Sequence, residues 1–156
     1  MDLRSALVVL VHLALLGLGG WLIVIDARTH RLPNRIVLPT LAALLALAII
    51  DALASAEKTP SIRALLGMLI LGGFYAMLRL LNRSSMGGGD VKLAAVIGLV
   101  LGWHGWTALA VGAAAAFVLG SLYALTLMAL HRATRSTRIA FGPWMIIGAF
   151  LGVLIT

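Results

Sequence analysis

Six apolar stretches, each as long as a membrane span or nearly so, take up most of this 156-residue chain. A helix that crosses the hydrocarbon core needs about 20 mainly apolar residues, so the chain has room for about six spans and little else. The sequence therefore predicts an all-α polytopic membrane protein with about six transmembrane helices in a single domain, residues 1–156. The predicted spans are Ser5 to Ile25, Ile36 to Ala54, Ile62 to Leu81, Val91 to Trp106, Thr107 to Leu130 and Ile139 to Ile155.

The composition supports lipid as the main solvent of this chain. Hydrophobic residues make up 62% of it and charged residues only 11%, whereas soluble domains carry about 25% charged residues. So small a soluble domain could not bury this much apolar surface, and membrane lipids are the expected surroundings. Small residues spaced four apart, Gly98 with Gly102 and Gly148 with Gly152, predict close helix packing. The absence of cysteine excludes disulfides, thiolate metal sites and a cysteine nucleophile.

The net charge of +7 is explained better by lipid than by nucleic acid, because Lys and Arg gather in cytoplasmic loops beside anionic lipid. We therefore expect no nucleic-acid partner. Nine basic residues fall in the first, third and fifth loop regions, and three fall on the alternate side. This asymmetry predicts that the odd-numbered loops lie in the cytoplasm and both termini outside. The first stretch is longer than the apolar region of a signal peptide and no small-x-small cleavage site precedes Asp26, so we expect it to be kept as a helix. The nine are Arg28, Arg31, Arg35, Arg79, Arg83, Lys92, Arg132, Arg135 and Arg138; the three are Arg4, Lys58 and Arg63.

Two of the five acidic residues stand out by position. Asp2 and Glu57 lie in polar surroundings, and Asp51 lies near the outer end of the second span, where a charge costs less than at the bilayer centre. Asp26 closes the first apolar stretch and Asp90 opens the fourth, so both are predicted at the cytoplasmic face. Such residues can also be simple helix-end groups, with Asp90 as an N-cap.

The three residues before Asp90 are all glycine, Gly87, Gly88 and Gly89. Three glycines before a helix are unfavourable unless the backbone must turn sharply or something must approach it closely. The segment lacks the spacing of a phosphate-binding loop. We therefore predict a turning loop that a peptide backbone approaches beside Asp90.

Two neighbouring carboxyl groups have a specific use in peptide hydrolysis. Close like charges cannot both ionise, so one carboxylate takes a proton from water while the other, protonated, polarises the scissile carbonyl. The chain has no cysteine, no Ser/His pair in a recognisable setting and no HExxH zinc motif. A carboxylate dyad is the hydrolytic arrangement that the sequence can supply.

Three segments resemble the type IV prepilin peptidase family, a group of membrane GxGD aspartic proteases. Residues 26–34 resemble its Asp followed by a polar stretch and Leu-Pro-Asn. Residues 87–103 are similar to its GxGDxKL helix that ends in Leu-Gly-Trp, and residues 141–143 match its final Phe-Gly-Pro. Together the segments span essentially the whole chain.

The resemblance implies an aspartic endopeptidase that removes the leader of type IV prepilins or pseudopilins at the cytoplasmic face of the bacterial inner membrane. Carried onto this sequence, the catalytic pair is Asp26 and Asp90, with no metal or other cofactor. Bifunctional members carry an N-terminal insertion with paired CxxC motifs and an N-methyltransferase activity. Here the first span begins almost at Met1 and there is no cysteine, so we expect the short, peptidase-only form.

The resemblance and the local chemistry add supporting residues to the predicted site. Lys92 is a candidate for orienting the site or holding substrate carboxylates; the alternative is a snorkelling interface lysine. Pro33 and Asn34 are expected to shape the loop before the second span. Gly142 and Pro143, at the start of the last span, are expected to help receive an extended substrate, although Pro143 also suits a plain helix start.

A non-enzymatic protein is the competing hypothesis: a small transporter subunit or a pilus-assembly factor that uses Asp26 and Asp90 for ions or helix capping. A transporter tends to place its charged site near the bilayer midplane. Both aspartates are predicted at one membrane edge, which favours the protease.

Overall fold

The computed structural model describes residues 3–29, 32–81, 86–132, 134, 137 and 139–156. The described residues form six helices, which confirms the all-α prediction. Arg31, Arg83, Arg135 and Arg138 lie outside the described residues. The helices are α1 (Leu3–Thr29), α2 (Asn34–Ala54), α3 (Thr59–Leu81), α4 (Gly88–His104), α5 (Trp106–Ala129) and α6 (Gly142–Ile155).

The helices differ from the predicted boundaries by up to four residues, and two of the differences concern an aspartate. Helix α1 continues past Ile25 to Thr29, so Asp26 lies inside its last turns rather than after it. Helix α4 begins at Gly88, which places Asp90 in its first turn. Both carboxyl groups are therefore carried on helical backbone, where their positions are well defined.

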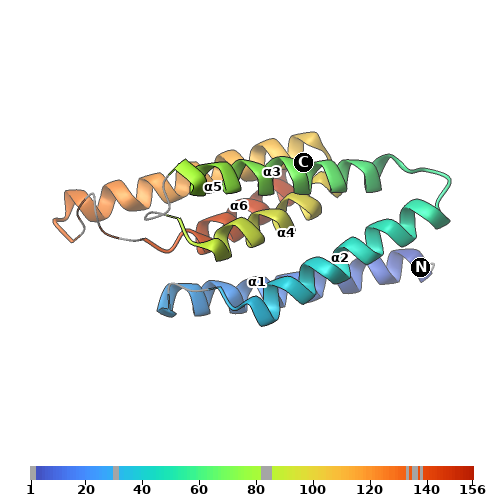
Figure 1. The fold of residues 1–156 in the computed structure, drawn as a ribbon, viewed down its shortest axis with the longest axis horizontal. Helices are drawn as coiled ribbons and strands as arrows, with labels where there is room; N and C mark the ends of the chain where they lie inside the picture. The colour runs from blue at the N-terminus through green and yellow to red at the C-terminus, as the bar shows by residue number, and fades with distance from the viewer. Residues whose placement is uncertain (1–2, 30–31, 82–85, 133, 135–136, 138) are drawn as a thin grey trace.

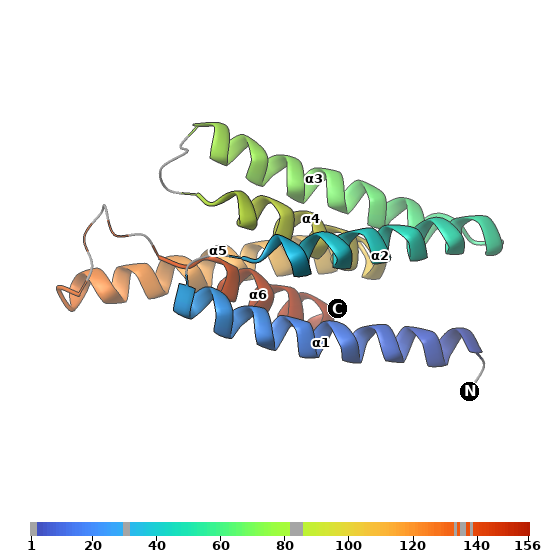
Figure 2. The ribbon, with the colours of Figure 1, turned by 60° about the horizontal axis from the view of Figure 1, so that its bottom comes forward.

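The six helices alternate in direction and form one elongated bundle (Figures 1 and 2). The ends of α1, α3 and α5 and the starts of α2, α4 and α6 all lie at the left in both views. We call this the aspartate end, because it holds the last turns of α1 and the first turn of α4. The amino terminus and the connection from α2 to α3 lie at the opposite end.

Helix α4 is the central element of the bundle. It packs against α2, α3, α5 and α6, whereas α1 packs mainly against α6. Helices α1, α2, α3 and α5 are long and apolar enough to cross a membrane, while α4 has 17 residues and α6 has 14. The buried residues of α4 are Leu93, Ala94, Val96, Ile97, Gly98, Leu99, Leu101 and Gly102.

Large apolar side chains on the outer helices point away from the bundle. Leu53 is 82% exposed, Leu80 is 70% exposed and Leu10 is 65% exposed. A water-soluble protein rarely exposes so much contiguous apolar surface. Lipid contact accounts for these side chains, in agreement with the predicted multi-pass membrane protein.

The spaced small residues pack helices together as predicted. A Cβ atom on Gly98 would collide with the backbone carbonyl of Gly67 on α3. On the other side of the bundle, a Cβ atom on Gly148 would lie 2.7 Å from the backbone nitrogen of Ala116 on α5. Close backbone approach holds helices together where lipid provides no hydrophobic drive for their association.

Candidate active site

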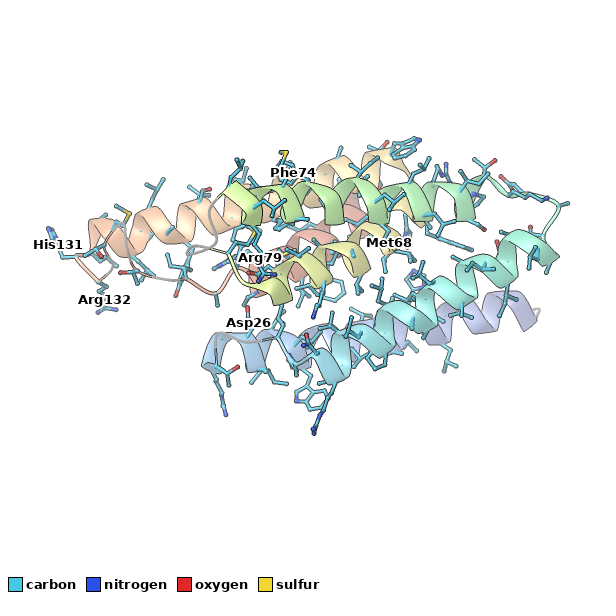
Figure 3. All side chains as sticks on the ribbon, viewed as in Figure 1. Asp26, Met68, Phe74, Arg79, His131 and Arg132 are labelled. Carbon is cyan, nitrogen blue, oxygen red and sulfur yellow. The ribbon has the colours of Figure 1, made fainter. Side chains whose placement is uncertain are left out.

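Asp26 is a buried carboxylate that joins two helices. Its side chain is only 3% exposed, and its Oδ2 accepts a hydrogen bond of 3.1 Å from the backbone N–H of Gly142. Gly142 is the first residue of α6, where backbone N–H groups have no partner within the helix. Asp26, carried on α1, therefore provides a hydrogen-bond acceptor for an N–H group at the start of α6. The positive end of the α6 dipole favours a negative charge at this position. Figure 3 shows Asp26 pointing from α1 toward the neighbouring helices.

At Gly142, α6 lies so close to the Asp26 carboxylate that there is no space for a larger side chain. A Cβ atom on Gly142 would collide with Oδ2 of Asp26. Pro143 follows as the second residue of α6 and has no N–H to satisfy. The Phe-Gly-Pro segment thus begins a helix and presents one N–H directly to Asp26.

Asp90 is held at the start of α4 by a similar contact. Its Oδ2 accepts a hydrogen bond of 3.0 Å from the backbone N–H of Gly87, the residue before the helix. This is the contact that the acidic residue makes in a capping box. The structure therefore assigns Asp90 a capping contact from the third position of α4, not from the N-cap position itself.

Asp26 in the last turns of α1 and Asp90 in the first turn of α4 both lie at the aspartate end of the bundle. They come from α1 and α4, which are distant in sequence. Asp51 does not join them: it lies on α2 near the opposite end, and its Oδ2 accepts a 3.0 Å hydrogen bond from Oγ of Ser61. Asp26 and Asp90 therefore lie at one end of the bundle and Asp51 lies toward the other.

The glycine segment differs from the predicted turning loop. Gly87 has an extended backbone, with φ −72° and ψ 151°, and Gly88 and Gly89 already belong to α4. The turning loop predicted for this segment is wrong, since two of its three glycines are helical and within the described residues Gly105 is the glycine with a positive φ. The close approach comes from the chain itself. A Cβ atom on Gly89 would lie 2.8 Å from Cβ of Leu32, and one on Gly88 would meet the Arg79 guanidinium.

Lys92 and Asn34 are in direct contact. The Nζ of Lys92 on α4 donates a 2.9 Å hydrogen bond to Oδ1 of Asn34, the first residue of α2. Pro33 precedes α2, and its carbonyl accepts the N–H of Ile36 at 3.0 Å. The Leu-Pro-Asn segment thus starts α2 and fixes it to α4 two residues after Asp90.

Two side chains of α3 near this site carried no role in the sequence interpretation. Arg79, counted there as a loop charge, points toward the start of α4 (Figure 3). Tyr75 is 1% exposed. Both residues lie on the face of α3 that packs on α4. Their spacing in the sequence puts them on one face of a helix, but only the register of α3 against α4 shows that this face meets α4. No group of three His, Asp or Glu side chains within the described ranges could hold a metal ion.

The arrangement provides the groups that peptide hydrolysis by carboxyl pairs requires. Two close carboxyl groups cannot both ionise readily, so one holds a proton while the other is charged. Backbone amides fix one oxygen of each, which restricts their orientation. Such a pair can take a proton from water and donate one to a carbonyl oxygen.

The chain is similar to known leader peptidases. Residues 13–130 match the model of the type IV leader peptidase family. The chain is 33% identical over 153 residues to a prepilin leader peptidase/N-methyltransferase of Dickeya chrysanthemi, which covers 97% of this chain and 53% of that relative. It is 30% identical over 131 residues to the enzyme of the same name from Stutzerimonas stutzeri, covering 83% and 44%. The chain thus spans about half the length of the curated relatives it matches. No solved structure matches it.

Proposed function

Because the chain belongs to the type IV leader peptidase family, we propose that it is a membrane aspartic endopeptidase that removes the leader of type IV prepilins or pseudopilins. The observation that carries the proposal is that the aspartate end holds two carboxyl groups, Asp26 on α1 and Asp90 on α4, each bound to a backbone N–H. The names of the relatives support a prepilin substrate. The proposal covers the peptidase reaction alone, without methyl transfer.

The proposed reaction uses one carboxylate and one carboxylic acid. The ionised group of the Asp26 and Asp90 pair takes a proton from a water molecule, which attacks the scissile carbonyl carbon. The protonated group donates its proton to the carbonyl oxygen, and the tetrahedral intermediate then collapses as the leaving amine gains a proton. The amides of Gly87 and Gly142 hold the two carboxyl groups in orientation.

The proposed location of the reaction is the cytoplasmic face of the inner membrane, with both termini outside. Its support is the excess of basic residues in the odd-numbered loop regions. Because the chain has no cysteine, single cysteines can be labelled without background. A membrane-impermeant maleimide added to intact cells should label Lys58→Cys and leave Arg132→Cys unlabelled. The reverse pattern would place the aspartates at the other face.

A cleavage assay with purified components tests the activity. The chain is reconstituted into vesicles with a purified prepilin, and the product is measured by mass spectrometry. The expected product lacks the leader and carries no added methyl group. A stable, reconstituted chain that leaves the prepilin intact would instead favour a transporter subunit or an assembly factor.

A further inference from the structure

The packing of α3 against α4 places Tyr75 level with Asp90. The antiparallel pair is closest where Gly67 faces Gly98. Each step forward along α3 corresponds to a step backward along α4. Tyr75 lies eight residues after Gly67, and Asp90 lies eight residues before Gly98.

Two further close approaches bracket this position. On one side of Tyr75, a Cβ atom on Gly72 would lie 3.2 Å from Cβ of Ala95. On the other side, a Cβ atom on Gly88 would lie 3.0 Å from Cζ of Arg79. The register is therefore continuous through the level of Tyr75 and Asp90.

The ring of Tyr75 is buried and packs on aromatic side chains, one of which adjoins the residue that binds Asp26. Tyr75 is among the largest fully buried side chains, and its ring centroid lies 5.7 Å from that of Phe117 and 6.1 Å from that of Phe141. Phe141 immediately precedes Gly142, whose N–H binds Asp26. The register of α3 against α4 places Tyr75 at the level of Asp90. A buried tyrosine hydroxyl usually requires a polar partner.

Several other charged or polar groups lie at the aspartate end and must be kept constant in any test. Five of the helices contribute one group each. Helix α1 contributes a carboxyl group and α3 contributes a guanidinium. Helix α4 contributes an ammonium, α2 contributes a neutral amide and α6 contributes a backbone N–H. These groups are Asp26, Arg79, Lys92, Asn34 and the N–H of Gly142.

Building on the proposed peptidase function, we propose that Tyr75 is a positioning residue for Asp90. Its hydroxyl donates a hydrogen bond to the Asp90 carboxylate in the working enzyme, which fixes the orientation of that group and favours its ionised form. A hydrogen bond to the charged form of an acid stabilises that form. The aromatic neighbours keep the phenol ring at the required place and angle.

The variant Tyr75→Phe removes the hydroxyl and keeps the ring. We expect kcat to fall about tenfold with KM unchanged, the size of effect given by losing a hydrogen bond to a charged group. The pH–rate profile should move toward higher pH, because Asp90 then ionises less readily. The matched control is Tyr123→Phe on α5, whose ring packs on Trp144 with centroids 4.9 Å apart, and it should behave as the unmodified protein.

A second readout does not depend on cleavage. The infrared carbonyl band of protonated Asp90, assigned by its loss in Asp90→Asn, should titrate at higher pH in Tyr75→Phe. Replacing Tyr75 by 3-fluorotyrosine, which keeps a hydroxyl, should restore both kcat and the titration. An unshifted band in a folded Tyr75→Phe protein overturns the proposal, as does a loss of kcat that 3-fluorotyrosine does not restore. Failure of the unmodified protein to cleave prepilin counts against the peptidase function, and the infrared titration still decides the role of Tyr75.

Discussion

Both ends of the bundle hold a carboxyl group on a polar partner, but only the aspartate end holds two together. At that end, Asp26 and Asp90 accept backbone N–H groups at the starts of two helices, and we propose that they act as a pair. At the opposite end, Asp51 accepts a hydroxyl hydrogen bond from Ser61. A single carboxyl held by a hydroxyl can stabilise a helix connection, whereas acid–base hydrolysis needs a pair.

The packing of the two ends differs as well. The opposite end contains a cavity of about 590 Å³ between α1, α2 and α4, lined mostly by apolar side chains. His12 and His104 lie at its wall, with their Nε2 atoms 2.9 Å apart. At the aspartate end, glycines bring the helix starts into contact with Asp26, Leu32 and Arg79. Close packing fixes reacting groups to the accuracy that catalysis requires, so polar side chains beside a cavity are not enough to make a site.

Removing either acid of the pair should have the largest effect. Asp26→Asn and Asp90→Asn should each lower kcat by at least about a thousandfold, because an amide cannot replace a carboxyl in proton transfer. Cleavage kinetics of purified variants check this, with membrane insertion measured in parallel. Near-normal turnover by either variant would remove that residue from the site.

Gly142→Ala should have the next largest effect on kcat. The added methyl group would collide with Oδ2 of Asp26 and displace it, and a displacement of about 1 Å can lower a rate about a hundredfold. Gly73→Ala is the matched control, since no atom lies within 4 Å of its Cβ position. Equal kcat values for these two variants would show that the Gly142 contact has no role in positioning Asp26.

The bond between Lys92 and Asn34 should have a moderate effect. Lys92→Met and Asn34→Leu should each lower kcat/KM about threefold to tenfold, the range for one neutral or charged hydrogen bond. If this bond is their shared contribution, the double variant should be no worse than either single one. Additive losses would mean that Lys92 acts separately, for example on the substrate.

The opposite end should tolerate substitution. Asp51→Asn retains an oxygen that can accept from Ser61, so we expect cleavage within about twofold of the unmodified protein. The same kinetic assay measures this. A loss comparable to that of Asp90→Asn would contradict the distinction between the two ends.

The sequence predicted the helices, and it predicted one end of the bundle for both Asp26 and Asp90, because both predictions depend on local signals. Apolar length marks the spans, and the positions of Asp26 and Asp90 at the ends of apolar stretches placed them on one side. The contacts that orient them depend on register between helices, which a single sequence does not specify. The bond between Lys92 and Asn34 and the level of Tyr75 could therefore not be predicted.

The glycine segment illustrates the same limit. Three consecutive glycines correctly indicated a close approach, yet the approaching groups are Leu32 and Arg79 of the chain itself. A glycine that is required because another group approaches closely looks the same in the sequence whether that group belongs to the protein or to a substrate. Only the packed structure distinguishes a side chain of the protein from a substrate.

The pH dependence of kcat/KM for the unmodified protein tests most directly whether the two carboxyl groups act as a pair. Two coupled acids that share one proton in the active form give a bell-shaped profile, with one limb for each macroscopic ionisation of the free enzyme. We therefore expect cleavage of a reconstituted prepilin to rise and then fall with increasing pH, with both limbs set by the pair. A rate that rises to a plateau and stays there while the protein remains folded would indicate a single base and contradict the paired site.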